Sequence, residues 1–242
     1  IELGTRSLLI EDGKKLILID CGLGDKQDEK FFGHYSLWGD DSLDKNLKKY
    51  GFVQDDITDV FLTHLHFDHC GGAVEWNDDR TGYRPAFKNA HFWTNENHWK
   101  WATEPNPREK ASFLKENILP MQESGQLNFL PIPGTGNYGF APDLKMDVIF
   151  VDGHTEKQML PVIQYQEKTI VFAADLIPTA GHIPQVYVMG YDTRPLLTME
   201  EKGKFLQKCV DNDYLLFFEH DAYNELASLK MTDRGIKLNE TY

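Results

Sequence analysis

The chain has 242 residues, of which 41% are hydrophobic and 26% are charged, a composition that supports a sizeable buried core and is typical of a soluble protein. Its 25 basic and 38 acidic residues give a formal net charge of -13, which repels nucleic-acid phosphates and anionic membranes. No apolar stretch approaches the length of a membrane span, so together with the charge the sequence predicts neither a nucleic-acid nor a membrane partner.

The cysteines indicate a reducing compartment. Cys21, Cys70 and Cys209 are widely spaced and form no C-x-x-C pair, which argues against a disulfide framework and favours a cytoplasmic location. We expect Cys70 to be a small buried residue beside a functional site. Because the sequence begins with Ile1, not Met, and residues 1–10 already have the pattern of a strand, we expect an N-terminal segment to be missing, and this segment could carry a targeting signal.

The first elements are a hairpin and a helix. Apolar residues at 6–10 and 15–19 are joined by a turn that contains Asp-Gly, the usual signal for a hairpin. A helix is expected over residues 41–51, with Ser42 as its N-cap and Gly51 at its end. Its predicted inward face consists of Leu43, Leu47 and Tyr50.

A dense group of metal-ligand residues follows the next expected strand, at residues 59–63. The group consists of His64, His66, Asp68 and His69, with the apolar Leu65 and Phe67 between them and Gly71-Gly72 closing the turn. Imidazole and carboxylate ligands suit zinc, iron, nickel or manganese. Open α/β sheets usually place their chemistry where strands end, so this pattern predicts a structured metal site.

The remainder of the chain alternates strands with helices. Further strands are expected at residues 90–94, 145–151, 160–166, 169–174 and 214–218. Further helices are expected at residues 95–104, 110–124 and 200–211. This alternation predicts an α/β fold.

Four motifs in order resemble the metallo-β-lactamase superfamily. The first is the H-x-H-x-D-H pattern of His64 to His69. The others are Asp152-Gly153-His154-Thr155, Phe172-Ala173-Ala174-Asp175 and Phe218-Glu219-His220-Asp221. The resemblance implies an αββα sandwich with the metal site at one edge of the sheets. Since ligands come from both halves of the chain, we expect residues 1–242 to form a single domain.

The resemblance also implies the role of each ligand. His64, His66 and His154 would hold one divalent metal, whereas Asp68, His69 and His220 would hold a second. Asp175 would bridge the two. Zinc is the first choice, with iron, manganese, cobalt or nickel as alternatives. In this family a hydroxide between the metals attacks the substrate, and an aspartate matching Asp20 accepts a hydrogen bond from a ligand histidine.

The segment from Ala173 to Thr193 is similar to the quorum-quenching branch of this superfamily, which opens N-acyl-homoserine lactones. We therefore expect an enzyme, a dinuclear metal-dependent hydrolase of such lactones, with Asp68 and Asp175 as catalytic residues as well as ligands. Hydrolysis of phosphotriesters or aryl esters, as in the methyl parathion hydrolase-like enzymes, is the alternative. A non-catalytic or redox metal protein ranks third. A homodimer is compatible with the resemblance.

One position departs from the lactonase pattern. Several lactonases carry a tyrosine three residues after the bridging aspartate, where this chain has Pro178. His182 is our candidate for a catalytic replacement, with Tyr191 and Tyr223 as weaker ones. Aromatic residues at 31–38 and 91–101 are expected to contribute in part to a pocket for an acyl chain.

Overall fold

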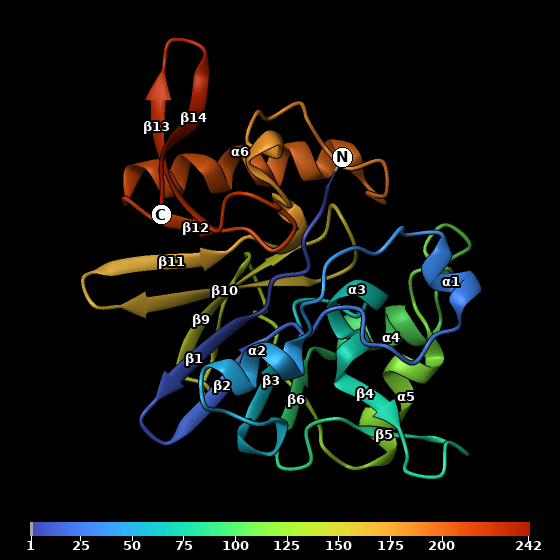
Figure 1. Ribbon diagram of the computed structural model, residues 1–242. Helices are drawn as coiled ribbons and strands as arrows, with labels where there is room; N and C mark the ends of the chain where they lie inside the picture. The colour runs from blue at the N-terminus through green and yellow to red at the C-terminus, as the bar shows by residue number, and fades with distance from the viewer. Residues whose placement is uncertain (1) are drawn as a thin grey trace. The chain divides into compact units, whose positions relative to one another are not determined.

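A computed structural model describes residues 2–242 and divides them into two compact units (Figure 1). The N-terminal unit is Ser7–Phe129. The C-terminal unit consists of residues 2–6 and 130–242. Each unit contains one main sheet, and Ile1, the first residue of the strand pattern expected at the start of the chain, lies outside the described residues.

The main sheet of the N-terminal unit has the strand order β1-β2-β3-β6-β7. These strands are β1 (Leu8–Asp12), β2 (Lys15–Ile19), β3 (Asp59–Phe61), β6 (His91–Thr94) and β7 (Leu127–Phe129). Strands β1 and β2 form the expected antiparallel hairpin, in which Asp12 pairs with Lys15 and Gly13 takes a positive φ of 56°. The strands from β2 to β7 are parallel, so β2, β3 and β6 end at the same edge of the sheet.

Short helices and a small hairpin complete the N-terminal unit. The helices are α1 (Glu29–Gly33), α2 (Leu43–Lys49), α3 (Phe67–Cys70), α4 (Glu96–Thr103) and α5 (Lys115–Glu123), with 3-10 turns η1 (Gln54–Asp56) and η2 (Gly71–Ala73). The hairpin pairs β4 (Val74–Trp76) with β5 (Tyr83–Pro85). Helix α5 contacts both strands of this hairpin.

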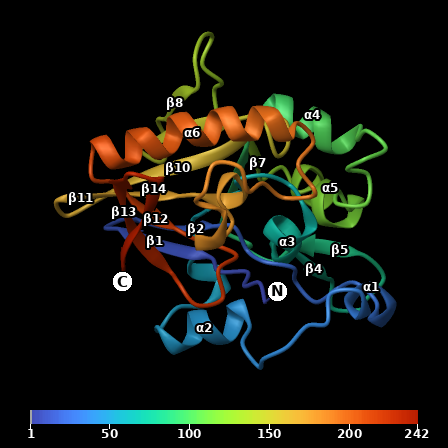
Figure 2. The same ribbon diagram turned by 90° about the horizontal axis from the view of Figure 1, so that it is seen from above.

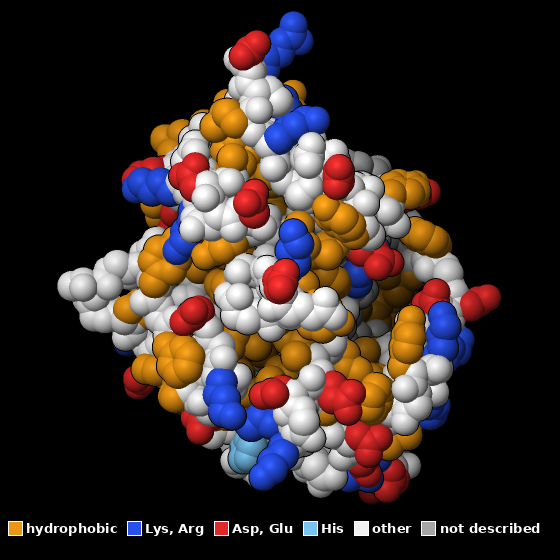
Figure 3. Space-filling view, turned by 90° about the vertical axis from the view of Figure 1, so that its left-hand side faces the viewer, with side chains coloured by type: hydrophobic (Ala, Val, Ile, Leu, Met, Phe, Trp, Pro, Cys, Tyr) orange, Lys and Arg blue, Asp and Glu red, His pale blue; other side chains and the backbone are white. Residues whose placement is uncertain are grey.

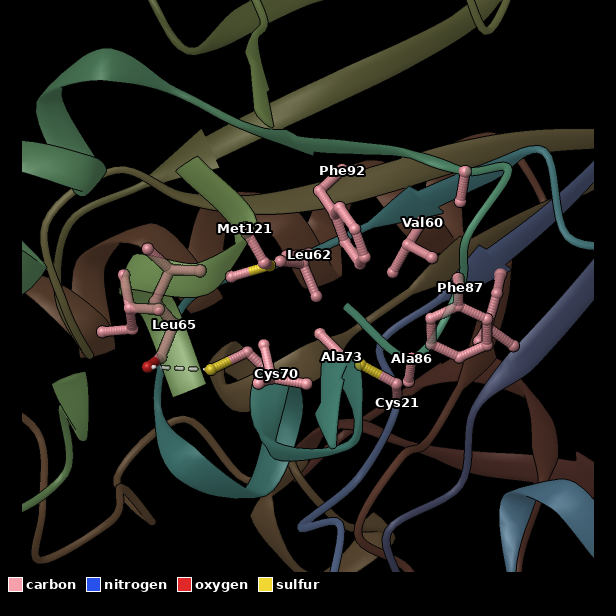
Figure 4. Close-up of a cluster of buried hydrophobic side chains, with 14 of the residues drawn as sticks. Cys21, Val60, Leu62, Leu65, Cys70, Ala73, Ala86, Phe87, Phe92 and Met121 are labelled. Carbon is pink, nitrogen blue, oxygen red and sulfur yellow. Dashed lines mark hydrogen bonds between the residues drawn. The ribbon is translucent and has the colours of Figure 1, made fainter. Parts of the chain in front are cut away.

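Aliphatic, aromatic and thiol side chains form the core of the N-terminal unit. Figure 4 shows part of this core, where Val60 and Phe92 from the sheet and Leu62, which directly follows β3, lie close to Met121 from α5. Cys70 lies in the same cluster, and its thiol donates a hydrogen bond to the carbonyl oxygen of Leu65 at 3.3 Å. The burial expected of Cys70 is therefore confirmed, and it raises the pKa of the thiol to about 12.

The C-terminal unit has a sheet of the order β14-β13-β12-β11-β10-β9-β8. Its strands are β8 (Tyr138–Ala141), β9 (Met146–Val151), β10 (Gln158–Tyr165), β11 (Lys168–Phe172), β12 (Leu215–Phe217), β13 (Leu226–Thr232) and β14 (Gly235–Thr241). All neighbours are antiparallel except β11 and β12, which are parallel. As a result, β9, β11 and β12 run in one direction and end at one edge.

One long helix, α6 (Pro195–Asp211), belongs to the C-terminal unit. It runs beside the sheet and contacts β13 and β14 (Figures 1 and 2). Phe205, Leu206 and Cys209 are buried and Val210 is half-buried, so these residues form its inward face. Two 3-10 turns, η3 (Ala174–Leu176) and η4 (Ala180–His182), follow β11.

The expected α/β class is confirmed. Each element predicted from the sequence is present, although α5 begins at Lys115, later than residue 110, and α6 begins at Pro195, earlier than residue 200. Ser42 caps α2 through the backbone N–H of Lys45, and Gly51 follows with a positive φ of 87°. The prediction that Tyr50 shares the inward face of α2 is wrong, because 72% of this residue is exposed. That the chain forms a single domain stays a prediction.

The surface carries charges of both signs. On the face shown in Figure 3, acidic and basic side chains alternate and hydrophobic side chains are exposed among them. The net charge of -13 is thus not concentrated in one patch on that face. Among residues 2–242, no helix is long and apolar enough to cross a membrane.

Candidate metal centre

In the N-terminal unit, the parallel strands bring the ligand motif and its supports to one edge. Asp20 follows β2, the segment from Thr63 to His69 follows β3, and His98 lies in α4 after β6. The backbone N–H of Leu65 donates to Nε2 of His98 at 2.8 Å, which fixes the loop between the ligand histidines. The motif is therefore held by neighbouring strands as well as by its own turn.

Asp20 fixes the orientation of two ligand histidines. Its Oδ2 accepts a hydrogen bond from Nδ1 of His69 at 2.9 Å and one from the hydroxyl of Thr63 at 2.6 Å, while Oδ1 accepts from the Thr63 backbone N–H at 2.8 Å. Because the Thr63 hydroxyl donates to Asp20, it can only accept from Nδ1 of His64, which lies 3.1 Å away. Both rings thus carry their proton on Nδ1 and present Nε2 as the lone-pair nitrogen. The hydrogen bond expected of Asp20 is present.

His66 has its own support. Its Nε2 lies 3.4 Å from Oε1 of Glu109, a buried carboxylate whose Oε2 accepts hydrogen bonds from Nε1 of Trp101 and Nδ2 of Asn106, each at 2.6 Å. With its proton on Nε2, His66 presents the lone pair of Nδ1, which lies 3.0 Å from Nε2 of His64. Two lone pairs at this separation repel each other unless they share a cation.

Asp68 is the most exposed member of the motif. Its side chain is 28% exposed, and its Oδ2 lies 4.0 Å from Nε2 of His69, whose side chain is fully buried. The two ligand atoms therefore face the same region from the first turn of α3. Carboxylate and imidazole at this spacing suit one divalent metal ion.

In the C-terminal unit, the three remaining candidate ligands follow strands that end at one edge. His154 comes after β9, Asp175 after β11 and His220 after β12. The backbone N–H of His220 donates to the carbonyl of Pro178 at 3.2 Å, and the N–H of Ala173 donates to the carbonyl of Phe217 at 2.9 Å. These bonds hold the turn of Asp175 against the turn of His220.

The carboxylate of Asp175 contacts both candidate histidines of this unit. Its Oδ2 lies 3.0 Å from Nε2 of His154, and its Oδ1 lies 2.9 Å from Nε2 of His220. The Nδ1 of His220 faces the carbonyl oxygen of Gly4 at 2.8 Å, so it must carry a proton. Nδ1 of His154 faces Oδ1 of Asp192 at 2.9 Å and is a donor for the same reason.

This donor set fits divalent metal ions. In a neutral imidazole with its proton on Nδ1, Nε2 has a lone pair, and in each histidine that lone pair faces a carboxylate oxygen of Asp175. Ligand atoms that each lie about 2.1 Å from one metal are about 3.0 to 3.4 Å apart, and the Asp175 contacts of 3.0 and 2.9 Å are close to the lower end of this range. One carboxylate with a histidine at each oxygen is the arrangement expected of a bridging ligand.

The charges around His154 favour a cation of any kind. Burial opposes a positive charge on this histidine, but Asp175 and then Asp192 outweigh burial and raise its pKa to about 9. The two carboxylates that stabilise a proton on His154 also stabilise a metal ion at Nε2. Metal binding at this position therefore competes with protonation.

The candidates for the missing tyrosine have different surroundings. His182, in η4, is half-buried, and its Nδ1 lies 2.8 Å from the hydroxyl of Thr179. Burial and then the ammonium of Lys202 lower its pKa, while the nearby carboxylates of Asp175 and Asp192 oppose the shift. Tyr191 is 72% exposed and Tyr223 is 79% exposed. The hydroxyl of Tyr223 donates to the carboxylate of Glu2.

Three supporting residues were not predicted from the sequence. Thr63 and Asp192 lie next to recognised motifs, whereas Glu109 lies in a loop without an apolar pattern. A carboxylate near an Asn and a Trp carries no ligand spacing, so no local signal identifies Glu109. The segment from Ala173 to Thr193 was recognised, but its Asp192 was not linked to His154.

Comparison with known proteins gives one consistent result. A sequence model described as the metallo-beta-lactamase superfamily matches residues 2–220. An N-acyl homoserine lactonase of Bacillus thuringiensis is 24% identical over 229 residues, which cover 90% of this chain and 81% of the lactonase. A probable metal-dependent hydrolase from Staphylococcus aureus has a TM-score of 0.81 and 23% identity, covering 99% of this chain and 83% of the hydrolase.

A second solved structure is that of AidC, a dizinc quorum-quenching lactonase with a homoserine product bound. Its TM-score is 0.76 with 22% identity, covering 99% of this chain and 80% of AidC. These likenesses confirm the expected fold. The match over residues 2–220 shows that the chain belongs to the metallo-beta-lactamase superfamily and is a metal-dependent hydrolase.

Proposed function

We propose that the chain is a dinuclear metal-dependent lactonase. His64, His66 and His154 would hold the first metal and Asp68, His69 and His220 the second, with Asp175 as the bridge. The observation that carries this proposal is the pair of contacts made by Asp175, with His154 at one carboxylate oxygen and His220 at the other. The fixed ring protons of all five histidines support it, because each leaves a lone-pair nitrogen for a metal.

When bound, two divalent ions would lower the pKa of a coordinated water and polarise a carbonyl oxygen, with zinc as the first choice. The side chains of the protein would determine where these ions bind. Asp20, Glu109 and Asp192 hold ligand rings in one orientation, and Asp68 and Asp175 are acceptors for a proton during turnover. No serine or cysteine nucleophile is then needed.

The substrate we propose is an N-acyl-homoserine lactone. Support comes from the similarity to an N-acyl homoserine lactonase of Bacillus thuringiensis and from the segment between Ala173 and Thr193. A neutral lactone also meets no long-range repulsion from a net charge of -13.

An aromatic cluster at the metal motif supports an acylated substrate. Phe67, between ligands His66 and Asp68, packs at 5.3 Å from the ring of Phe31 and 4.9 Å from that of Tyr35. Phe67 and Phe31 are half-buried and Tyr35 is 44% exposed, so the cluster presents apolar surface beside the ligands. This surface would contact the acyl tail.

One observation favours a second function. Pro178 stands where several lactonases have a tyrosine, and a proline cannot donate a hydrogen bond to a lactone carbonyl. Phosphotriester or aryl-ester hydrolysis at the same metals is therefore the alternative.

A substrate panel on metal-reconstituted protein distinguishes the two functions. We expect ring opening of N-acyl-homoserine lactones, detected chromatographically as the free acid, with a KM that falls as the acyl chain lengthens. Each buried CH₂ contributes about 0.8 kcal/mol, so Phe67→Ala should flatten this dependence. Turnover of an aryl phosphotriester without ring opening at any chain length would establish the alternative and overturn the lactonase.

A further inference from the structure

Helix α6 contains a fully buried lysine that has no role in holding the metals. Lys202 has 0% relative exposure. Its ammonium donates to the carbonyl oxygens of His182 at 2.9 Å and Pro184 at 3.2 Å, and to that of Tyr187. An ammonium group has three N–H donors, and here all three are used on one short stretch of backbone.

The partners of Lys202 show what it stabilises. Burying an ammonium group without a carboxylate partner is costly, and burial lowers the pKa of Lys202 to about 8, with Asp192 opposing the shift. Its three hydrogen-bond acceptors are all backbone carbonyl groups, and Asp192 adds a favourable charge. These carbonyls belong to residues 182–187, so the lysine fixes this segment. Removal of the lysine side chain would leave three carbonyl oxygens without a hydrogen-bond donor.

The same segment is attached to α6 at a second point. Nε2 of Gln185 donates to the carbonyl oxygen of Met199 at 3.0 Å. A Cβ atom at Gly203 would lie 2.5 Å from this nitrogen, so the glycine allows Gln185 to lie against the helix. Two consecutive positions of α6, Lys202 and Gly203, therefore determine how the segment docks.

Three hydrogen bonds hold His182, at the start of this segment, and the turn that contains it. Lys202 binds its carbonyl oxygen, the Thr179 hydroxyl lies at its Nδ1, and the backbone N–H of Ala180 in the same turn donates to Oδ2 of Asp221 at 2.8 Å. Asp221 directly follows the ligand His220. The turn of His182 is thus tied to a metal-ligand turn within the C-terminal unit.

The imidazole of His182 has one ring nitrogen, Nε2, that is available to bind a substrate. When the Thr179 hydroxyl donates to Nδ1, the proton of the neutral ring lies on Nε2. Among residues 2–242, Nε2 of His182 has no hydrogen-bond partner. The ring belongs to the turn that Ala180 ties to Asp221, the neighbour of His220, so it lies near the candidate ligands of its own unit.

We propose that Lys202 is a positioning residue that holds His182 so that its Nε2–H donates a hydrogen bond to an oxygen of the metal-bound substrate. His182 would then supply the contact that Pro178 cannot make. This inference rests on the proposed hydrolase function and adds the residue that determines where the substrate oxygen is held. Lys202 acts on the backbone of His182 and does not touch the substrate.

The test combines Lys202→Met with His182→Asn in a double-mutant cycle on metal-loaded protein. Lys204→Met is the matched control, since Lys204 lies in the same helix and its side chain is 76% exposed. The first readout is hydrogen exchange at the amides of His182, Ile183 and Tyr187, each of which donates to the carbonyl oxygen of the residue three positions before it. The second is kcat for the best substrate of the panel, with metal content measured in parallel.

We expect Lys202→Met to raise exchange at these three amides and to lower kcat by about a hundredfold, as a displacement of about 1 Å can do. The metal content should be unchanged, His182→Asn should have a similar effect on kcat, and the double variant should be no slower than either single variant. Lys204→Met should match the wild type in all readouts. If Lys202→Met does not fold, Lys202→Gln, which retains two donors, replaces it.

Unchanged exchange in Lys202→Met would overturn the inference, as would losses of kcat that multiply in the double variant. An absence of turnover by the wild type on every substrate would be a failure of the proposed function itself. The exchange measurement would still decide whether Lys202 holds the segment, so the two failures are distinguishable.

Discussion

At the scale of single residues, Asp20 combines a buried carboxylate that accepts several hydrogen bonds with an unusual backbone conformation. It receives hydrogen bonds from His69 and Thr63, and it takes a positive φ of 51°. Asparagine tolerates this backbone conformation, so Asp20→Asn changes the charge and the acceptors with little strain. We expect metal affinity to fall by about ten- to a hundredfold, measured by titration against a competing chelator.

The control for this experiment is Asp41→Asn, at an exposed position of the same unit, which should leave metal affinity unchanged. If Asp20→Asn bound metal as tightly as the wild type, Asp20 would be a turn residue and not an anchor for His69 and His64.

Asp175 carries the second prediction at this scale. In the proposed dinuclear centre Asp175 would serve both ions, so Asp175→Ala should reduce the metal content from the expected value of about two per chain and abolish turnover. Elemental analysis of protein purified without chelator measures the content, with Asp143→Ala at an exposed position as the control. Retention of both metals and full activity in Asp175→Ala would show that the bridge lies elsewhere.

The sequence reveals metal ligands better than it reveals their supports. His64, His66, Asp68 and His69 were identifiable because ligand chemistry repeats at close spacing. Asp20 was identifiable because it ends an apolar strand in a recognised family. Glu109 was not, because its contact with His66 spans 43 positions and arises only when the chain folds.

At the scale of elements, α6 organises the turn that precedes His154. Glu201 accepts hydrogen bonds from the N–H groups of Asp152 and Gly153, each at 2.9 Å. Gly153 lies directly against the helix, because an added Cβ would approach the backbone nitrogen of Thr198 to 2.5 Å. Either the turn or the helix would have to move to admit a side chain.

Gly153→Ala should therefore lower stability and weaken metal binding together. Overpacking of this kind costs about 1–3 kcal/mol, which denaturant unfolding of the chelated and metal-loaded protein can measure. Gly134→Ala is the control, because no atom lies within 4 Å of its added Cβ. Wild-type stability in Gly153→Ala would show that α6 does not constrain this turn.

Elements with a clear apolar pattern were predicted correctly, whereas elements without one were missed. The hairpin of β1 and β2 and the strand β3 were recognisable because their residues are apolar and bounded by turn signals. Strands β13 and β14 were not predicted, because their side chains are mostly half-buried or exposed and show no continuous apolar run. The start of α6 was missed although Pro195, in its first turn, is a start signal.

At the scale of the whole molecule, the proposed ligands come from both units, so metal binding should stabilise the entire chain. At a free metal concentration of about 100 times Kd, a bound ion contributes about 2.7 kcal/mol to folding. For a chain of this length that corresponds to a rise in Tm of about 5–10 °C. We expect a single calorimetric transition at the higher temperature when metal is present.

Variants in either unit should remove this rise, with His64→Ala representing the N-terminal unit and His154→Ala the C-terminal unit. The control is the chelated wild type, which should match both variants. Two separate transitions with metal present, only one of them shifted, would contradict a centre that draws its ligands from both halves.

The three buried thiols can report on local unfolding of the native protein, because each becomes accessible only when the structure around it opens. Cys21 and Cys70 lie in the N-terminal unit and Cys209 lies in the C-terminal unit. Burial raises the pKa of both Cys70 and Cys209 to about 12, so neither reacts as a thiolate while its unit is closed. The rate at which an alkylating reagent modifies each thiol would therefore measure how often that unit opens, and mass spectrometry would resolve the two rates in one sample without any introduced label.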